Sequence, residues 1–300
     1  MLDYRHQTFL VLCRIGSYTQ AAKVLNLTQP AVTQHIKALE AHYGSPLFTY
    51  ANRTLTLTEH GKLLYEFASR VSSDSDILTE RLRQKDLASP HLRFGATLSI
   101  GQYIMPSLIK QILATMPATS VSMVVENTQH LLEKLVQGDI QFALIEGIFD
   151  KTAYHSELFA MEPFIGVCSK DSLLADRPVS FDELISHHLI VREPGSGTRE
   201  ILESLLHQHN FSINSFAKVT EIGNKEAIKQ LVKDDLGITF LYRVVAQEEL
   251  ARGELRELSV KGMDVQHELN FVFLKGSQHS EEYLSWYRAF KEGYQGQKLR

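Results

Sequence analysis

The pattern of apolar residues changes at Ser89-Pro90, and this change constrains the fold more than any other feature of the sequence. Before it, apolar residues recur mainly at helical spacing. After it, short apolar runs such as LRFGAT, VSMVVE and FALIEG alternate with helical segments such as SLIKQILATM and LLEKLVQG. This alternation is typical of α/β units with a mostly parallel sheet. The 300 residues are therefore predicted to form a helical amino-terminal module and a larger α/β body.

Two short helices are predicted to open the chain. Residues 4–15 place apolar side chains at helical spacing, and Gly16 follows where a left-handed cap would end a helix. A second helix runs to Leu25, with Ser17 or Thr19 as its amino-terminal cap. Alanines on its inner face allow the neighbouring helices to approach closely.

The third predicted helix carries the most informative pattern of this segment. Thr28 can cap it, Pro30 lies in its first turn where a missing N–H costs nothing, and it is expected to end at Tyr43. One stripe is apolar and is predicted to be buried: Val32, Ile36, Leu39 and Tyr43. The opposite face is polar: Gln29, Thr33, Gln34 and Lys37. Such side chains read base edges and phosphates from a major groove, so the arrangement indicates a helix-turn-helix.

A strand signal follows this helix. Residues 53–58 alternate threonine and leucine after an arginine, which predicts a short strand that forms a wing. Arg53 can enter a minor groove or contact a phosphate, while the leucines hold the wing on the helices. The predicted DNA-binding residues are Thr28, Gln29, Pro30, Thr33, Gln34, Lys37 and Arg53.

The charge distribution agrees with a nucleic-acid module at the amino terminus. The net charge of the whole chain is −4, which by itself argues against nucleic-acid binding. Residues 1–65, however, hold six basic and three acidic side chains, a net charge of +3, which leaves −7 for the remainder. The basic charge is therefore concentrated in the segment that is predicted to contact DNA.

These residues resemble a known family. The string AAKVLNLTQPAVTQHIKALEAHYGSPLF, followed by Arg53 and LTLTEHG, is similar to the winged helix-turn-helix of LysR-type transcriptional regulators. The resemblance covers about the first 65 residues. One position departs from it, because many members have arginine where this chain has Tyr50.

A long helix is predicted between the module and the body. From Thr58 the chain has no strong helix breaker until Pro90. Apolar residues recur on one face at heptad-like spacing: Leu64, Phe67, Val71, Leu78 and Leu82. This pattern predicts a linker and dimerisation helix over residues 59–89. The alternative is an amphipathic helix that packs only on its own chain.

The resemblance also implies an assembly. Linker helices of this family pair antiparallel, which implies a homodimer through residues 59–89, and the family favours a dimer of dimers, a homotetramer. Such a dimer would bind double-stranded promoter DNA with inverted-repeat half-sites on one face of the duplex. The resemblance also allows a contact with RNA polymerase.

The expected fold class is α+β multidomain: a winged helix-turn-helix, a long linker helix, and a periplasmic-binding-protein-like body of two α/β subdomains. The resemblance implies two lobes joined by two crossing strands, placed near 161–167 and 263–269. The expected domains are 1–58 for DNA binding, 59–89 for the linker helix and 90–300 for effector binding. Lobe one covers 90–161 and 270–300, and lobe two covers 162–269.

The sequence EPGSGTR at 193–199 is predicted to be an anion-binding turn between a strand and a helix. Glycines expose backbone N–H groups, hydroxyls add donors and an arginine adds positive charge: Gly195, Ser196, Gly197, Thr198 and Arg199. It matches neither a Walker loop nor a nucleophile elbow. The alternative is a capped helix start with Arg199 in a structural ion pair.

Further polar residues are predicted at the same cleft, because ligands of such sheets bind where strands end and helices begin. Thr97 and Ser99 follow the first strand of the body. Glu146 ends the strand FALIEG, and Asn224 lies in the turn EIGN. A carboxylate beside an anion is unexpected unless Glu146 pairs with Arg199 or orients donors.

EPGSGTR, TLSIG and LIEG are similar to one branch of the family, which includes activators of sulfite-reductase and carbon-fixation operons. That resemblance implies an activator and a small anionic effector, either sulfite or sulfate, or a phosphorylated metabolite. No other cofactor is expected.

Other classes of function are disfavoured. Cys13 and Cys168 are expected to be reduced core residues, and the histidines, including His187-His188, lack the spacing of metal ligands, so no metal site is predicted. No catalytic motif indicates an enzyme. No membrane span or secretion signal is recognised, so a cytoplasmic protein is expected. The alternative of another class is an α/β solute-binding or enzymatic protein whose amino-terminal helices serve only dimerisation.

Overall fold

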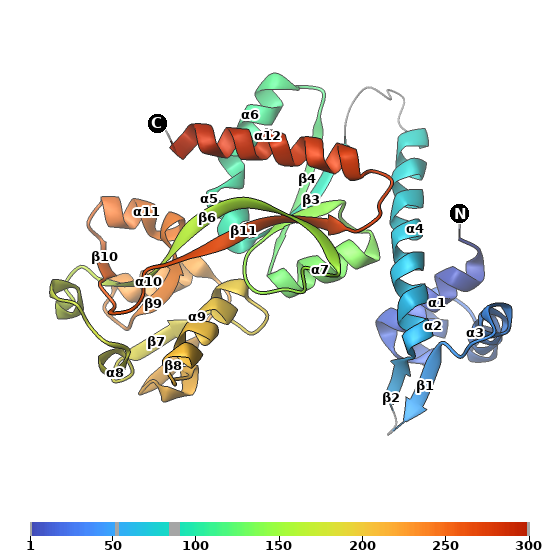
Figure 1. Cartoon of the computed structure of the whole chain (residues 1–300), viewed down its shortest axis with the longest axis horizontal. Helices are drawn as coiled ribbons and strands as arrows, with labels where there is room; N and C mark the ends of the chain where they lie inside the picture. The colour runs from blue at the N-terminus through green and yellow to red at the C-terminus, as the bar shows by residue number, and fades with distance from the viewer. Residues whose placement is uncertain (1, 52–53, 84–90, 299–300) are drawn as a thin grey trace. The chain divides into compact units, whose positions relative to one another are not determined.

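The structure is a computed structural model that describes residues 2–51, 54–83 and 91–298. The chain divides into two compact units. The amino-terminal unit holds residues 1–88 and two short later segments, 136–139 and 276–280, and the body holds the rest. Figure 1 labels the helices and strands of both units. No helix among the described residues is long and apolar enough to cross a membrane.

The three predicted helices open the amino-terminal unit: α1 (Tyr4–Ile15), α2 (Tyr18–Leu25) and α3 (Gln29–Tyr43). Local caps fix their ends. The hydroxyls of Ser17 and Thr28 each accept a hydrogen bond from a backbone N–H in the first helical turn. Gly16 and Gly44 end α1 and α3 with φ of 67° and 66°, a conformation that costs glycine little. The helix starts and stops were therefore predictable from neighbouring residues.

The predicted wing strand is one half of a hairpin. β1 (Phe48–Ala51) pairs antiparallel with β2 (Thr54–Leu57). Leu55 and Leu57 are half-buried while the threonines between them are more exposed, which confirms the expected alternation. The sequence prediction lacked β1, because the four residues FTYA are too few to show a clear strand pattern.

The linker helix α4 (Glu59–Arg83) contributes to the core of the amino-terminal unit. Leu64 and Ala68 pack with α1–α3 residues such as Phe9 and Ile36. The prediction that Leu64 lies on a dimerising face was wrong, because its side chain is buried within its own chain. Residues 84–89, the end of the predicted linker, lie outside the described residues.

Two residues expected in this core are less buried than predicted. Tyr43 is 44% exposed, and its hydroxyl lies 2.8 Å from His6 Nε2. It lies in the last turn of α3, where its hydroxyl reaches a polar partner at the surface. Cys13 is only half-buried, although burial raises the pKa of its thiol to about 12, whereas Cys168 is buried.

A mixed sheet of seven strands forms the centre of the body. β3 (His91–Thr97) pairs parallel with β4 (Ser120–Glu126) and with β5 (Phe142–Ile145), as the β-α-β pattern predicted. All other pairings in this sheet are antiparallel. The expectation of a mostly parallel sheet was therefore wrong. The β-α-β pattern does not include the two long connecting strands, which pair antiparallel with each other and with their other neighbours.

The connecting strands are β6 (Tyr154–Ser169) and β11 (Val265–Leu274). They pair antiparallel from Tyr154–Leu274 to Phe164–Val265, with one register shift at Leu269/Asn270. Figure 1 shows them side by side through the middle of the body. Both are longer than the crossing strands predicted near 161–167 and 263–269, and β6 also pairs with β9 (Thr239–Tyr242) and β10 (Leu255–Leu258).

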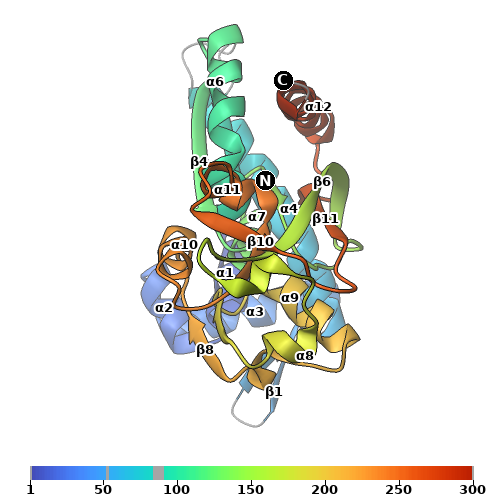
Figure 2. The same ribbon diagram turned by 90° about the vertical axis from the view of Figure 1, so that its left-hand side faces the viewer.

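The first lobe of the body contains β3–β5 and four helices: α5 (Leu98–Tyr103), α6 (Met105–Thr115), α7 (Thr128–Gln137) and α12 (Ser280–Lys298). Its core is aromatic. Phe142 stacks between Phe94 and Phe271 at centroid distances of 5.3 and 4.5 Å, and Phe290 of α12 packs against Phe94. Figure 2 shows α6 and α12 at the same end of the body, where Gly293 lies against Leu108.

The second lobe contains β7 (His188–Val191), β8 (Lys218–Glu221), β9 and β10, where β7 and β8 pair parallel. Its helices are η1 (Leu173–Asp176), α8 (Phe181–Leu184), α9 (Gly197–Gln208), η2 (Ile213–Ser215), α10 (Lys225–Lys233) and α11 (Arg243–Ala251). The starts of α9 and α10 meet the first lobe at the cluster described next.

Candidate functional site

The predicted DNA-reading face is the outer face of α3. Gln29, Pro30, Gln34 and Lys37 are exposed, and Thr33 is half-exposed. Apolar residues of the same helix, Val32, Ile36 and Leu39, are buried on the opposite side, as predicted. The structure thus presents these polar side chains together on one exposed helix face.

Two hydroxyls of this face are already bonded to backbone. Thr28 Oγ1 accepts from Ala31 N–H at 3.3 Å, and Thr33 Oγ1 donates to the carbonyl of Gln29 at 3.0 Å. Thr28 therefore holds the start of α3, while the longer side chains of Gln29 and Gln34 extend from the exposed surface. Arg53 lies outside the described residues. Tyr50, in β1, is exposed.

A second candidate site is a buried polar cluster between the two lobes of the body. Its first-lobe residues come from strand ends: Thr97 ends β3, Ser99 lies in α5 and Glu146 follows β5. All three side chains are buried. Thr97 Oγ1 has no hydrogen-bond partner among the described residues.

Glu146 is the centre of this cluster and is only 2% exposed. Its Oε1 accepts from Thr198 Oγ1 at 2.9 Å and lies 3.4 Å from Lys225 Nζ. Its backbone carbonyl accepts from Thr128 Oγ1 at 2.7 Å. Glu146 Oε2 is buried without a hydrogen-bond partner in the described part of the chain. Of the two roles considered for Glu146, pairing with Arg199 is not what the structure shows, since Lys225 takes that place.

The glycines of the EPGSGTR turn allow close packing. A Cβ on Gly197 would lie 2.4 Å from the carbonyl oxygen of Glu146, and a Cβ on Gly147 would lie 2.4 Å from Gly197 Cα. Gly195 has φ of +80°, which favours glycine. Ser196, the residue before α9, is buried and its hydroxyl has no partner among the described residues. The turn therefore places Ser196 and Thr198 against the end of β5.

Arg199 and Asn224 have local partners. Arg199 forms ion pairs with Glu203 at 2.8 Å and Glu221 at 2.6 Å, the arrangement weighed above as the alternative to anion binding. Asn224 is exposed and caps α10 by accepting from Ala227 N–H at 3.0 Å. Both side chains thus fix the helices that carry the cluster.

Lys225 is the main residue of the cluster that sequence reasoning missed. It is 3% exposed, and its ammonium donates to Ser99 Oγ and faces Glu146. Burial lowers the pKa of Lys225 to about 8, although Glu146 opposes this shift. Its position directly after the predicted site residue Asn224 was a usable signal, since a lysine in the first turn of a helix is unfavourable beside the helix dipole.

Arg192 and Tyr242 complete the surroundings. Arg192, at the end of β7, is 3% exposed and bonds Glu193 through Nε and Nη2, both at 2.7 Å, while its Nη1 has no partner among the described residues. Burial, with Glu146 and Glu162 nearby, raises the pKa of Tyr242 well above its usual range. A cavity of about 10 Å³ is lined by Arg192, Thr198 and Lys225, which is room for about one water molecule.

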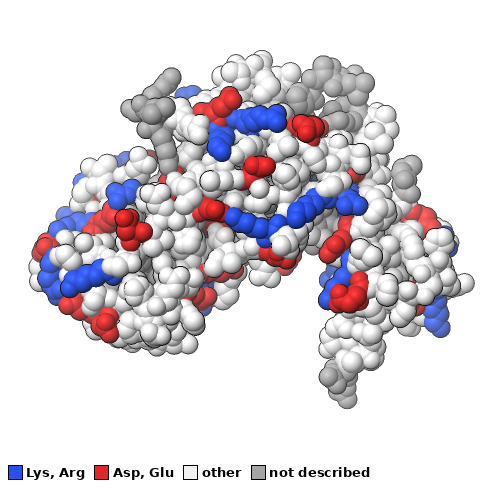
Figure 3. All heavy atoms as spheres, viewed as in Figure 1, with Lys and Arg blue, Asp and Glu red and all other residues white. Residues whose placement is uncertain are grey.

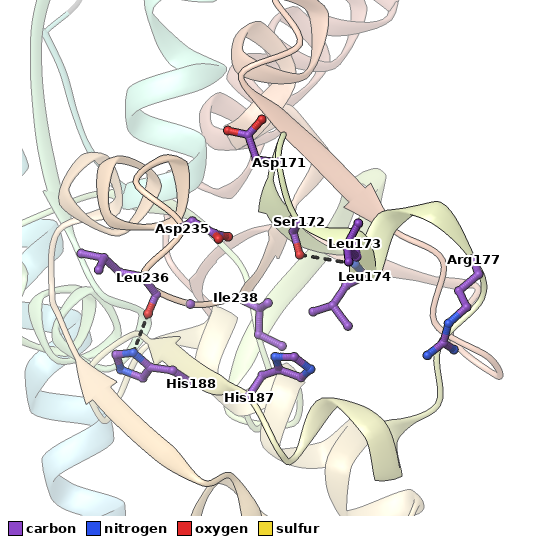
Figure 4. A pocket seen from close by; sticks show the side chains of 11 residues that line it. Asp171, Ser172, Leu173, Leu174, Arg177, His187, His188, Asp235, Leu236 and Ile238 are labelled. Carbon is purple, nitrogen blue, oxygen red and sulfur yellow. Dashed lines mark hydrogen bonds between the residues drawn. The ribbon is translucent and has the colours of Figure 1, made fainter.

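A larger hollow of about 600 Å³ lies elsewhere in the second lobe, lined by residues of η1, β7 and the loop before β9 (Figure 4). His188 lies at its edge with both ring nitrogens bonded, Nδ1 to the Leu236 carbonyl at 2.6 Å and Nε2 to Thr220 Oγ1 at 2.8 Å. These bonds tie β7 to its neighbours, and so give His188 a structural role.

Comparison with known proteins identifies the family. Residues 5–62 match the bacterial regulatory helix-turn-helix proteins of the lysR family, and residues 85–295 match the LysR substrate binding domain. The chain belongs to the LysR family of transcriptional regulators. It is a DNA-binding regulator and not an enzyme, which excludes the alternative of a dimerising solute-binding or enzymatic protein.

Individual relatives support the carbon-fixation branch. The chain is 30% identical to the transcriptional activator CmpR of Synechocystis sp. over 279 residues, covering 92% of this chain and 90% of CmpR. It is 29% identical to the RuBisCO operon transcriptional regulator of Acidithiobacillus ferrooxidans, covering 99% of each. The Synechocystis CcmR regulatory domain, solved in complex with 2-PG, superposes with a TM-score of 0.62 at 23% identity, covering 69% of this chain and 98% of that domain.

Proposed function

We propose that this LysR-type regulator reads inverted-repeat promoter DNA as a homodimer and responds to a small oxyanion bound in the Glu146–Lys225 cluster. The single observation that carries the effector half of this proposal is the buried cluster between the lobes, in which hydroxyl, ammonium, guanidinium and carboxylate groups converge. Burial of so many polar groups without complete pairing is costly, so such clusters are typical of binding sites.

The proposed DNA readout rests on the exposed face of α3. Gln29, Thr33, Gln34 and Lys37 would enter the major groove, while Thr28 and Pro30 hold the start of the helix near the backbone. Arg53 of the wing would add a phosphate or minor-groove contact. Gln and Thr side chains on this helix face suit base readout better than the Glu–Lys pairs that are typical of an ordinary solvent-exposed helix.

The proposed homodimer contact rests on α4. Leu63, Phe67, Leu78 and Leu82 are exposed large apolar side chains on this helix. Burial of such residues against a second copy would gain about 1.5–3 kcal/mol for each fully buried side chain. We assign the homodimer contact to residues 59–89, and a dimer of dimers to the complete regulator.

The effector contacts are assigned from the geometry. Thr97, Ser99, Glu146, Ser196 and Thr198 would face the anion, joined by Lys225. Gly195 and Gly197 would offer backbone N–H groups at the start of α9, while Arg199 and Asn224 would hold α9 and α10 in place. A phosphorylated metabolite is favoured, because the CcmR domain binds 2-phosphoglycolate, and sulfite or sulfate is the other candidate.

Binding of the anion would change contacts between the lobes. Lys225 of the second lobe bonds Ser99 of the first, and Tyr103 at the end of α5 donates to Glu226 of α10. The cavity holds only about one water, so an anion must displace some of these contacts. Differential affinity for two arrangements of the lobes is then the source of regulation.

The test uses the full-length protein. Its affinity for promoter duplexes from its own genome should fall steeply as salt rises, and a phosphorylated effector should change that affinity or the length of DNA protected. A Lys225→Met variant should bind DNA with unchanged salt dependence but lose the response to the anion. DNA binding that is independent of salt would contradict the proposed DNA readout. An unaltered response to the anion in the Lys225→Met variant would contradict the proposed effector site.

The remaining assignments follow from the same proposal. A regulator that acts on promoter DNA works in the cytoplasm, and contact with RNA polymerase would accompany activation. CmpR, a relative, is named an activator, which supports positive control. The lobe boundaries at 161/162 and 269/270 would fall within β6 and β11, so these strands would be the hinge.

A further inference from the structure

We propose that Glu146 makes the cleft select oxyanions that still carry an acidic proton, such as hydrogenphosphate, hydrogensulfite or a singly protonated phosphate monoester, over fully ionised anions such as sulfate. The inference rests on the proposed effector site and specifies its ligand chemistry. It follows from one acceptor atom, its neighbouring donors and the charges that surround them.

The acceptor atom is Glu146 Oε2. The other carboxylate oxygen, Oε1, is already bonded to Thr198 Oγ1 and faces Lys225 Nζ. Oε2 is buried and has no hydrogen-bond partner among the described residues. An ionised carboxylate can only accept hydrogen bonds, so a ligand atom placed against Oε2 must donate one. An oxyanion can do so only through a protonated oxygen.

Other buried polar groups of the cluster also lack partners among the described residues. Ser196 Oγ, Thr97 Oγ1 and Arg192 Nη1 are buried and have no partner in the described part of the chain. Ser196 precedes Gly197, which packs on the Glu146 carbonyl, and Thr97 lies two residues before Ser99, the partner of Lys225. Unpaired hydroxyl and guanidinium groups in the cluster that holds Glu146 Oε2 match an anion with several bare oxygens and one hydroxyl.

The charges of the cluster point the same way. Two cations, Lys225 and Arg192, are balanced by Glu146 and by Glu193, which holds Arg192. A third carboxylate, Glu200, lies beside Gly147. Tyr242 adds a neutral phenol, because burial raises its pKa. An anion without a proton would place a bare anionic oxygen against the ionised oxygen of Glu146 in a buried site, which is strongly unfavourable.

Figure 3 shows basic and acidic side chains intermixed over the visible face of the body. The groups that would distinguish one anion from another are therefore the buried ones. Selectivity between anions of similar size then depends on hydrogen bonding at Glu146, since leaving a buried acceptor unpaired costs about 1–3 kcal/mol and more for a charged group.

The test measures binding of inorganic phosphate and of sulfate to the full-length protein by calorimetry at constant ionic strength, over pH 6 to 8.5. Phosphate should bind at least about tenfold more tightly than sulfate at low pH. This preference should persist to pH 8.5, because inorganic phosphate still carries one acidic proton there as hydrogenphosphate. The affinity for a phosphate monoester should instead fall as pH rises and the monoester loses its last proton, while sulfate affinity should stay weak. Binding of a phosphate monoester at the upper end of this range should be accompanied by proton uptake from the buffer.

Two variants separate the hydrogen bond from the charge. In Glu146→Gln the amide keeps an acceptor for Thr198 and Lys225 and offers a donor in place of Oε2, so sulfate should bind at least about tenfold more tightly than before and phosphate more weakly. Glu193→Gln is the matched control, because it removes one negative charge from the same cluster and leaves Glu146 Oε2 intact. It should keep the preference for phosphate.

Three outcomes would overturn the inference: equal binding of sulfate and phosphate by the unaltered protein, a preference that survives in Glu146→Gln, or a preference lost equally in Glu193→Gln. Sulfate binding that strengthens at low pH until it equals phosphate binding would also overturn it. The pH series on the unaltered protein decides the question even where a variant does not fold.

Parallel titrations identify the source of the protonated oxyanion. Inorganic phosphate, sulfite and 2-phosphoglycolate each offer the required hydroxyl, and the tightest of the three indicates the effector class. If neither phosphate, sulfite, 2-phosphoglycolate nor sulfate binds any variant, the effector site itself is refuted and this inference with it. Binding without selectivity refutes only the inference.

Discussion

Lys225 and Glu146 form a buried ion pair between the two lobes of the body, with Lys225 Nζ 3.4 Å from Glu146 Oε1 and both side chains almost inaccessible to solvent. The pair joins the first turn of α10 to the end of β5. Because each partner neutralises the other, removal of only one leaves a charge buried without compensation.

Lys225→Met should lower the free energy of unfolding by about 3–5 kcal/mol, because Glu146 then keeps a buried charge without its cation. The double variant Lys225→Met/Glu146→Gln should recover most of this loss, since it removes both charges. Urea unfolding at pH 7 measures both. Additive losses in the double variant would contradict the pairing.

The stability of the chain should depend on pH through Lys225. Burial lowers the pKa of this lysine to about 8, from 10.5 in the unfolded chain. Between these values the unfolded state binds more protons, so the contribution of Lys225 to the free energy of unfolding rises with pH, by roughly 3 kcal/mol over the whole window. The difference in unfolding free energy between the unaltered protein and Lys225→Met should therefore grow from pH 8 to pH 10. A constant difference would show that the lysine is not strongly desolvated.

Gly197→Ala should destabilise the body by about 1–3 kcal/mol and weaken effector binding, because the new methyl group would lie against the carbonyl of Glu146. Gly296 offers a control, since nothing lies within 4 Å of a Cβ placed on it and it lies in α12. Gly296→Ala should be neutral or stabilising by up to about 1 kcal/mol. Thermal unfolding of both variants checks the prediction, which fails if the two substitutions behave alike.

Gln29→Ala should relax sequence preference at one base pair by about 1–3 kcal/mol, because a bidentate base contact is lost. Arg53→Ala should instead weaken binding to all duplexes alike and reduce the salt dependence by about one charge. Competition between operator and mutated duplexes measures the first effect, and a salt titration measures the second. A uniform loss from both variants would refute the assignment of base readout to α3.

Leu78→Glu should dissociate the dimer without unfolding the amino-terminal unit, because Leu78 is 52% exposed on α4. Leu64→Ala is the contrasting variant, since Leu64 is buried in its own core and its truncation should cost about 2–5 kcal/mol in stability. Sedimentation and thermal unfolding distinguish the two effects. A Leu78→Glu protein that remains dimeric would place the interface elsewhere.

Much of the amino-terminal unit was predictable because its signals are local. Thr28, Pro30 and Gly44 set the limits of α3 within a few residues of the chain, and the apolar spacing of Val32, Ile36 and Leu39 selects the buried face. Leu64 was predicted to face a second copy of the chain but packs in the core of its own chain. Heptad spacing identifies an apolar face but does not say whether it packs on its own chain or on another.

The candidate effector site was predictable only in part. The structure buries Thr97, Ser99, Glu146 and Thr198, which strand ends and the glycine-rich turn predicted for one site, and it joins Ser99 and Thr198 to the Glu146–Lys225 pair. The roles of their partners were not predictable. Lys225 is 79 residues from Glu146 in the sequence. Arg199 forms its ion pairs with Glu203 and Glu221 of its own lobe.

The sequence by itself determined the helix limits, the family and the neighbourhood of the site, because caps, apolar periodicity and turn residues act over a few positions of the chain. The tertiary structure alone decided that Lys225 faces Glu146, that one oxygen of Glu146 has no partner among the described residues, and that β6 and β11 pair antiparallel through the body. These features depend on how two lobes pack, and packing joins residues that no local pattern connects.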